Sequence, residues 1–281
     1  MLKIEDIKNT IIEGDSLNIL KQIPDKSINM VITSPPYWGL RDYGITGQIG
    51  LETNFNDYIN NLIKIFNEVK RVLTDDGVCW VNIGDSYSKG KKRSNNVLSK
   101  SLCCVPDRFK IAMVDNGWIC RNEIIWHKPN AMPSSVKDRF TNDFEKVFFF
   151  TKNKKYFFNQ QKEPVQDTYN GRRGSSKTRK KFQSAMCGDH SSELKHYTER
   201  NKRTVWSIST QPFKDAHFAV YPEELIETPI KAGSPEDGII LDMFMGSGTT
   251  GLVVKRLNRN YIGIELNPQY IEIANKRIKE G

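Results

Sequence analysis

The sequence lacks the features that would place the chain in a membrane or an oxidising compartment. Its 281 residues contain no apolar run approaching the ~18 residues of a membrane span, and no apolar signal-peptide region follows the first methionine. The five cysteines are odd in number and form no C-x-x-C pair, so we expect neither a disulfide framework nor a metal site. These absences predict a cytoplasmic protein that folds without covalent or metal cross-links.

Acidic residues are scarce in one long stretch of the chain. Residues 86–215 contain 27 Lys and Arg but only 12 Asp and Glu, a net charge of +15, whereas the remaining residues carry −6. A basic segment joined to a neutral-to-acidic core is typical of proteins that bind a polyanion. A solvated lysine-rich surface would also be positive, but the localisation of the charge to one stretch favours nucleic acid.

A glycine-rich turn lies near the C-terminal end. Residues 239–244 predict a buried strand, residues 245–250 (Met-Gly-Ser-Gly-Thr-Thr) a turn, and residues 251–257 a helix. A second apolar run ends on Glu265, 19 positions after Gly246, which is the spacing at which a Rossmann-type unit places an acid on a ribose. The full G-x-G-x-x-G pattern is missing. The turn therefore favours a nucleoside with a small anionic tail, such as S-adenosyl-L-methionine, over NAD.

The other strands of such a sheet must come from the N-terminal part. Apolar runs predict strands at 10–13, 28–33, 77–83, 119–126 and 144–151, a 3.6-residue apolar period predicts a helix over 58–73, and a final helix is expected over 267–279. With the two C-terminal strands the total is seven. We therefore predict an α/β fold, a circularly permuted seven-stranded Rossmann-like sheet built from residues 1–151 and 216–281. The polar, basic residues 152–215 are expected to form an insert in this fold, with a second basic loop at 86–100, and such segments are common in nucleic-acid enzymes.

A proline-rich segment follows the strand predicted at 28–33. The segment Ser34-Pro35-Pro36-Tyr37 lies at the carboxyl end of that strand, where open α/β sheets place active sites. Two successive prolines fix the backbone and remove two N–H donors, which leaves the Ser34 and Pro35 carbonyls as rigid acceptors. An exocyclic amine that donates to Ser34 Oγ and a proline carbonyl would turn its nitrogen lone pair toward a methyl donor. Tyr37 and Trp38 offer aromatic faces for an extruded base.

Together these motifs resemble the permuted β group of amino-DNA methyltransferases, in which the catalytic motif precedes the cofactor motif and target recognition lies between them. The resemblance implies that residues 152–215 are the target-recognition insert and that residues 86–100 form a second DNA-contacting loop. The similarity extends over nearly the whole chain, including residues 12–16, 78–85, 124–130 and 218–222. It implies an S-adenosylmethionine-dependent methyltransferase fold with Asp15 near the adenine, Glu265 on the ribose and Phe218 at the methionine end. One departure is Met243, where the family usually has a turn-shaping proline. The implied cofactor residues are Asp15, Thr33, Phe218, Asp242, Phe244, Gly246, Ser247, Gly248, Thr249, Glu265 and Asn267.

The resemblance also suggests the target base. Ser34 at the first catalytic position is similar to the cytosine-N4 enzymes, whereas adenine-N6 enzymes mostly carry Asp or Asn there. We predict sequence-specific methylation of cytosine N4 in double-stranded DNA by base flipping, with adenine N6 as the open alternative. A monomer or homodimer is expected, with a cognate restriction endonuclease as a candidate partner. The expected DNA contacts are Trp38, Lys91, Lys92, Arg93, Arg172, Arg173, Arg179, Lys180 and Lys181.

Other functions fit the motifs less well. Cytosine-C5 methylation needs a Pro-Cys pair, which the sequence lacks. RNA and protein-glutamine methyltransferases usually carry Asn-Pro-Pro-Tyr downstream of the cofactor motif, not upstream. A non-catalytic DNA-binding module with a degenerate Rossmann core would have no reason to keep the Ser34–Tyr37 segment, the glycine turn and Glu265 together.

Overall fold

The computed structural model describes residues 1–88, 97–165, 198–211 and 220–281. The chain divides into two compact units, residues 1–159 with 204–281, and residues 160–203. In the smaller unit, β6 (Lys162–Pro164) pairs antiparallel with β7 (Glu199–Asn201), and Glu163 accepts hydrogen bonds from the Nε atoms of Arg200 and Arg203 at 2.8 and 2.6 Å.

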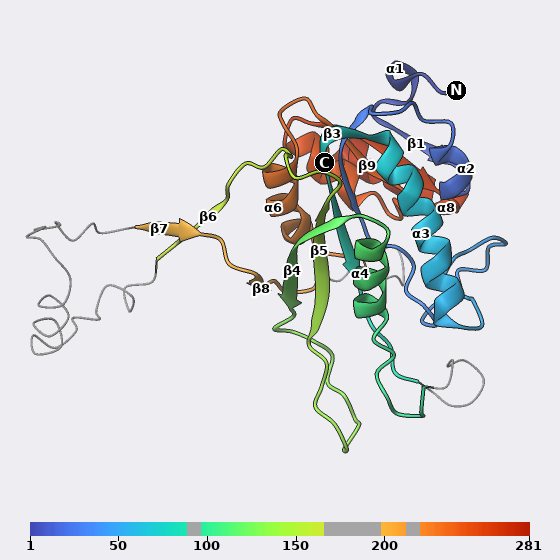
Figure 1. Cartoon of the computed structure of the whole chain (residues 1–281), viewed down its shortest axis with the longest axis vertical. Helices are drawn as coiled ribbons and strands as arrows, with labels where there is room; N and C mark the ends of the chain where they lie inside the picture. The colour runs from blue at the N-terminus through green and yellow to red at the C-terminus, as the bar shows by residue number, and fades with distance from the viewer. Residues whose placement is uncertain (89–96, 166–197, 212–219) are drawn as a thin grey trace, which may run out of the picture. The chain divides into compact units, whose positions relative to one another are not determined.

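The larger unit is built on one mixed sheet (Figure 1). Its strand order is β1-β10-β9-β2-β3-β5-β4-β8, so the last two strands of the chain lie between the first two. All neighbouring strands are parallel except β5, which is antiparallel to both β3 and β4. The strands are β1 (Thr10–Glu13), β2 (Ile28–Thr33), β3 (Leu73–Ile83), β4 (Ile119–His127), β5 (Phe144–Thr151), β8 (Val205–Ser207), β9 (Ile239–Asp242) and β10 (Asn260–Glu265).

The seven expected strands are confirmed, but the count of seven is wrong because β8 is an eighth. It pairs parallel with the outer edge of β4, and Trp126 Nε1 donates to the Ile208 carbonyl at 2.9 Å. A strand of three residues is too short to give a periodic signal, and its pairing with β4 satisfies backbone groups at a sheet edge.

Two layers of helices cover the sheet. One face carries α1 (Ile4–Ile7), α2 (Ser16–Leu20), α3 (Phe55–Val72) and α4 (Val105–Asp115), and the other carries α6 (Glu223–Gly233), α7 (Thr249–Arg256) and α8 (Pro268–Glu280). Alternate residues of a strand enter opposite cores, as Val31 packs with the first group and Ile32 with the second. The result is an α/β/α sandwich with buried strands.

Helix α3 illustrates why the sequence forms these elements. The Asn54 side chain caps its first turn by accepting from Asp57 N at 2.9 Å. Its fully buried side chains recur every three or four residues, and they include Tyr58, Leu62 and Phe66. Burial of each such side chain contributes about 1.5–3 kcal/mol, so the amphipathic pattern is enough to fix this helix against the sheet.

The division into units differs from the boundaries predicted at 152 and 215. Residues 152–159 belong to the larger unit, where Asn153 Nδ2 donates to the Asp75 carbonyl at 2.7 Å and Phe158 stacks on Phe149. Residues 204–211 also belong to it, because they form and extend β8. Apolar residues in a polar stretch account for both shifts, since their burial outweighs the composition around them.

The topology gathers several chain segments at one edge of the sheet. The parallel strands β2, β3, β4, β9 and β10 all end there, and β5 begins there because it runs the other way. The segments that follow Thr33, Ile83, His127, Asp242 and Glu265 are therefore neighbours in space. This is the edge at which open α/β sheets bind their ligands.

Candidate active site

A cavity of about 460 Å³ lies along this edge, within the range of ordinary ligand pockets. Its walls include Ser34, Pro35, Pro36 and Tyr37 of the proline-rich segment and, some 200 residues later in the chain, the turn after β9. The two motifs therefore share one cavity. Among the expected cofactor residues, the lining comprises Asp15, Phe244, Gly246, Ser247, Thr249, Glu265 and Asn267.

Glu265, the last residue of β10, is anchored by backbone amides. Its Oε2 accepts from Gly246 N at 2.7 Å and its Oε1 accepts from Asn267 N at 2.9 Å. Burial raises the pKa of this carboxyl, while the hydrogen bonds from Asn267 and Gly246 oppose that shift. Both oxygens retain lone pairs, so the carboxylate can accept further hydrogen bonds from a ligand in the cavity.

The two glycine amides of the turn after β9 are hydrogen-bonded within the protein. Gly246 N donates to Glu265, and Gly248 N donates to the Met245 carbonyl at 3.0 Å, so both amides are engaged within the protein. Gly248 does not line the cavity. It has φ +81°, and an added Cβ would lie 2.7 Å from Ala274 Cβ, so glycine is needed there for the close approach of α7 and α8.

Asp242 and Thr33 also lie outside the cavity lining, although both were expected at the cofactor. Asp242 is 1% exposed and accepts hydrogen bonds from Thr33 Oγ1 at 2.6 Å, Phe244 N at 3.0 Å, Thr250 Oγ1 at 2.5 Å and Tyr221 OH at 3.1 Å. Burial raises the pKa of Asp242, and the bonds from Thr250 and Thr33 counter it. The pair ties the turn to the end of β2, which makes these two residues structural supports of the site.

Two further expected cofactor residues are helix caps that face the cavity. Asp15 caps α2 by accepting from Asn18 N at 2.9 Å, and Asn267 caps α8 by accepting from Gln269 N at 2.9 Å. Thr249 Oγ1 accepts from Arg277 Nη1 at 2.7 Å. Phe218 lies outside the described residues.

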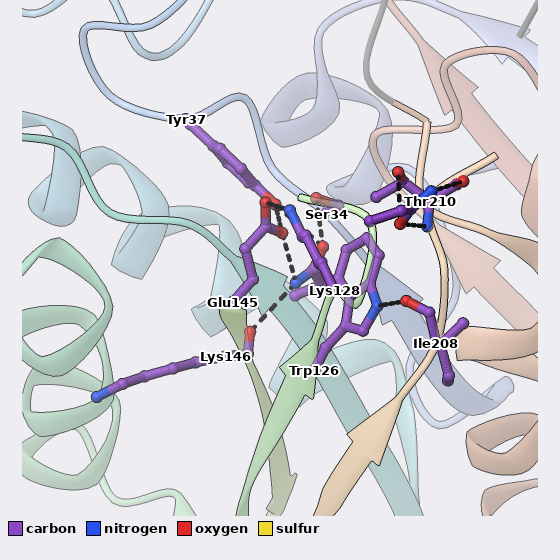
Figure 2. Close-up of polar contacts among 10 residues, drawn as sticks. Ser34, Tyr37, Trp126, Lys128, Glu145, Lys146, Ile208 and Thr210 are labelled. Atoms are coloured by element: carbon purple, nitrogen blue, oxygen red, sulfur yellow. Dashed lines mark hydrogen bonds and ion pairs between the residues drawn. The ribbon is translucent and has the colours of Figure 1, made fainter. Parts of the chain in front are cut away.

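Tyr37 is held by a polar cluster at the proline-rich side of the cavity (Figure 2). Its hydroxyl donates to Glu145 Oε2 at 2.6 Å and lies 3.0 Å from Asn82 Oδ1. Burial, and after it the Glu145 charge, raise the pKa of Tyr37 well above its ordinary value, so the hydroxyl stays a donor. The ring packs on Gly84, where an added Cβ would lie 2.5 Å from Tyr37 Cε2.

The carbonyl groups of Pro35 and Pro36 differ in their hydrogen bonding. The Pro36 carbonyl accepts from Tyr58 OH at 2.8 Å, which ties the segment to α3. No donor among residues 1–88, 97–165, 198–211 and 220–281 reaches the Pro35 carbonyl, and Pro35 lines the cavity. The acceptor expected from a proline is thus available at Pro35.

Trp38 corrects one prediction. It was expected to contact DNA, but it is only 4% exposed, donates from Nε1 to the Glu52 carbonyl at 2.9 Å and meets the Phe55 ring edge-on at 5.7 Å. A tryptophan beside a catalytic segment can serve the core as readily as a ligand, and its sequence position does not distinguish the two. The other expected DNA contacts, Lys91, Lys92, Arg93, Arg172, Arg173, Arg179, Lys180 and Lys181, lie outside the described residues.

Three cavity residues were not singled out from the sequence: Asn82, Lys128 and Glu145. Lys128 forms an ion pair with Glu145 and lies over the Trp126 ring at 4.4 Å from its centroid (Figure 2). Asn82 and Lys128 fall within stretches that carried the family resemblance. Glu145 had no such signal, because its position at this edge depends on the reversed direction of β5.

The loop after the proline-rich segment forms another wall that sequence reasoning missed. Its cavity-lining residues include Leu40, Tyr43 and Gln48, and Tyr43 meets Tyr270 of α8 edge-on at 6.3 Å. Burial raises the pKa of Tyr43. Repeated glycines mark the loop in the sequence but do not reveal that it faces the turn after β9.

None of the helices in the described part of the chain is long and apolar enough to span a membrane.

Comparison with solved structures identifies the fold. The PvuII DNA methyltransferase, a cytosine-N4-specific enzyme, superposes with a TM-score of 0.68 at 23% identity, covering 95% of this chain and 85% of that one. A putative DNA modification methylase from Thermus thermophilus, determined in complex with S-adenosyl-L-methionine, gives a TM-score of 0.64 at 23% identity, covering 96% of this chain and 93% of its own. The structure is thus an α/β methyltransferase fold with a mixed central sheet.

Sequence comparison adds the family. Residues 28–276 match the N6/N4 DNA methylase family. The type II methyltransferase M.Cfr9I of Citrobacter freundii is 41% identical, covering 96% of this chain and 87% of the relative. M.XycI of Xanthomonas campestris pv. cyanopsidis is 42% identical over 96% and 88%, and M.SmaI of Serratia marcescens 40% over 95% and 90%. The chain therefore belongs to the N6/N4 DNA methylase family and is a DNA methyltransferase.

Proposed function

We propose that this DNA methyltransferase transfers a methyl group from S-adenosylmethionine to the N4 amino group of cytosine in double-stranded DNA. The observation that carries the proposal is the shared cavity, which places Ser34 and the Pro35 carbonyl in the same space as Glu265 and the turn after β9. An acceptor pair for an amine and a carboxylate for a ribose are the two halves that such a reaction requires.

The cofactor end of the cavity has the chemistry for a nucleoside. Glu265 would accept hydrogen bonds from the ribose hydroxyls, with Phe244 and Asp15 toward the adenine. The cavity has room at Gly246, where an added Cβ would meet no atom closer than 3.9 Å. Its mainly apolar lining suits an adenine ring. Bound there, S-adenosylmethionine supplies an electrophilic methyl group on a sulfonium.

The chain's own residues would orient the acceptor amine. An exocyclic amine has its lone pair delocalised into the ring, and donation of its two protons to Ser34 Oγ and the Pro35 carbonyl favours tetrahedral geometry at nitrogen. That orients the lone pair without a covalent intermediate. The Tyr37 ring, packed on Gly84 and anchored through its hydroxyl, is a rigid surface for a flipped base. The proton released from the methylated nitrogen can pass to water.

Cytosine is favoured over adenine by the neutral acceptor at residue 34. A serine hydroxyl is a weaker acceptor than the carboxylate or amide that the adenine-N6 enzymes mostly use. The circular permutation of the fold and target recognition by an insert are part of the same proposal. The insert, predicted at 152–215 and including the separate unit 160–203, would contact phosphates and base edges with its arginines and lysines.

Product analysis tests the proposal. DNA incubated with the enzyme and S-adenosylmethionine is digested to nucleosides, and mass spectrometry is expected to find N4-methylcytosine. Ser34→Ala and Tyr37→Ala should each reduce transfer of a tritiated methyl group to DNA to a small residual rate. N6-methyladenine would overturn the choice of base, and full activity of Tyr37→Ala would refute its stacking role.

A second measurement addresses the insert. Arg172→Ala with Arg173→Ala should weaken DNA binding while leaving the affinity for S-adenosylmethionine unchanged, because phosphate contacts contribute to DNA affinity alone. The difference from wild type should shrink as the salt concentration rises. Unchanged DNA affinity at low salt would contradict a role of this segment in DNA contact.

A further inference from the structure

Asn82 is a buried polar side chain at the cavity, and the proposed reaction assigns it no role. It comes from β3, is 5% exposed and lines the cavity beside Ser34. Its amide nitrogen donates to Glu145 Oε2 and to the Lys146 carbonyl, both at 3.2 Å. Its Oδ1 faces the hydroxyls of Ser34 at 3.4 Å and Tyr37 at 3.0 Å.

A proton count shows how these contacts must be used. Both protons of the Asn82 amide are taken by acceptors, which fixes the orientation of the side chain with Oδ1 toward Ser34. Tyr37 has one hydroxyl proton, and the 2.6 Å contact with the Glu145 carboxylate is the shorter and charge-assisted one. Asn82 Oδ1 is then open to accept from the Ser34 hydroxyl, which also contacts the Tyr37 oxygen on the same side of the cavity wall.

We infer that Asn82 is a positioning residue that directs the Ser34 proton away from the substrate, so that Ser34 presents its lone pairs to the target amine. The inference rests on the proposed amino-methylating function. The Ser34–Asn82 distance of 3.4 Å is long for a hydroxyl donor, as catalytic hydrogen bonds often are before substrate binds.

The chemistry of the base explains why the direction of this proton matters. The target amino group lies next to a ring nitrogen that accepts hydrogen bonds. A serine whose hydroxyl rotates freely can donate to that ring nitrogen, and it then no longer accepts from the amine. A carboxylate cannot make this error because it has no proton to donate. For a serine at this position, the hydrogen bond to Asn82 directs the hydroxyl proton away from the ring nitrogen.

Charged neighbours hold Asn82 in place. Glu145, at the start of β5, accepts from Asn82 and Tyr37 through Oε2 and pairs with Lys128 through Oε1. The Lys128 and Glu145 side chains are 19% and 17% exposed, so their attraction is only partly screened. The Lys128–Glu145 pair therefore fixes Tyr37 directly and Ser34 through Asn82.

A double-mutant cycle tests the link. In the wild-type background, Asn82→Ala should lower kcat for methyl transfer about 100-fold, the order of effect of a misplaced reacting group. The dissociation constants for S-adenosylmethionine and for DNA should stay unchanged. In a Ser34→Ala background, the same substitution should change the single-turnover rate constant less than about threefold, because the Ser34 hydroxyl through which Asn82 acts is absent. Equal fold-losses in the two backgrounds would overturn the inference.

The control and a second variant keep the test decisive. Asn122→Ala, on the exposed side of β4, should match wild type in kcat and in melting temperature. If Asn82→Ala does not fold, or Ser34→Ala leaves too little activity to measure, the pH profile of Asn82→Asp provides the test instead. The protonated Asp side chain can donate to Glu145 and accept from Ser34, whereas its ionised form is repelled by Glu145.

Relative to wild type, the kcat of Asn82→Asp should therefore rise as pH is lowered. The charged and titratable groups that face this position are Glu145, Lys128 and Tyr37; the ammonium of Lys146 pairs with Asp107 and Glu123 instead. A pH profile parallel to that of wild type would refute the positioning role. Failure of the wild-type enzyme to methylate an amino group would instead refute the proposed function, so the two failures are distinguishable.

Discussion

Replacement of Glu265 by glutamine tests the cofactor end of the site most directly. The carboxylate accepts from two backbone amides, at 2.7 Å from Gly246 and 2.9 Å from Asn267, and would accept from the ribose hydroxyls as well. Glutamine has nearly the same shape but only one carbonyl oxygen. Its NH₂ group must face one of the two amide donors, which breaks one anchor and removes the negative charge.

The expected loss follows from the hydrogen bonds at stake. A hydrogen bond to a charged group contributes about 1.5–3 kcal/mol, and about 1.4 kcal/mol corresponds to a factor of ten in affinity. Glu265→Gln should therefore raise the dissociation constant for S-adenosylmethionine roughly 10- to 100-fold. Isothermal titration calorimetry without DNA measures this constant directly. Glu272→Gln, at an exposed position of α8, should leave it unchanged.

The pH dependence has a definite sign. Burial raises the pKa of Glu265, so the carboxyl takes up a proton at a higher pH than an exposed glutamate does. The ribose hydroxyls are better held by the ionised form, so cofactor affinity should fall as the pH is lowered toward this raised pKa, and should fall less in Glu265→Gln. A group with a raised folded-state pKa also makes the protein less stable at pH above that value, so the variant should not melt earlier through loss of charge. A glutamine variant that binds the cofactor within about twofold of wild type would refute the assigned role.

Two further predictions concern stability. Gly248→Ala should lower the free energy of unfolding by about 2–4 kcal/mol, because it combines the cost of a left-handed backbone with a Cβ at 2.7 Å from Ala274 Cβ. The control is Gly44→Ala, where φ is +72° but no atom lies within 4 Å of an added Cβ, so the free energy of unfolding should fall only by the backbone contribution of about 1–2 kcal/mol. Equal losses for the two variants in urea unfolding would contradict the packing argument. Trp38→Ala should lower the free energy of unfolding by about 3–5 kcal/mol, because it truncates a core side chain. The folded variant should keep wild-type DNA affinity in a filter-binding assay. A loss of DNA binding without a loss of stability would instead support a DNA contact by Trp38.

The sequence predicted the strands well where burial gives long apolar runs. Residues 28–33 and 144–151 match β2 and β5 at both ends, because a run of apolar side chains marks the buried part of each strand. Strand β8 was missed, because three residues carry no period and its place depends on the free edge of β4. The direction of β5 was equally invisible in the sequence, although it brings Glu145 to the cavity.

The site shows the same division between chemistry and placement. Two prolines after a strand, and an acid 19 positions after Gly246, indicated chemistry that depends on residue type and spacing alone, and both groups face one cavity. Which neighbours face a ligand was a different matter. Asp242 and Thr33 bond to each other in the core, and Trp38 packs on Phe55. Motif membership does not reveal on which side of the backbone a side chain lies.

By itself, the sequence determined the class of the protein and the residues of its two motifs, since rigid prolines, a glycine turn and a spaced carboxylate carry their chemistry in their covalent structure. Only the tertiary structure decided which polar groups surround Ser34. Asn82 and Glu145 lie on β3 and β5 and Lys128 directly follows β4, and the parallel ends of β3 and β4 together with the reversed β5 bring the three within hydrogen-bonding distance. Hydrogen bonds act over about 3 Å, so partners that are distant in sequence are chosen by the fold alone.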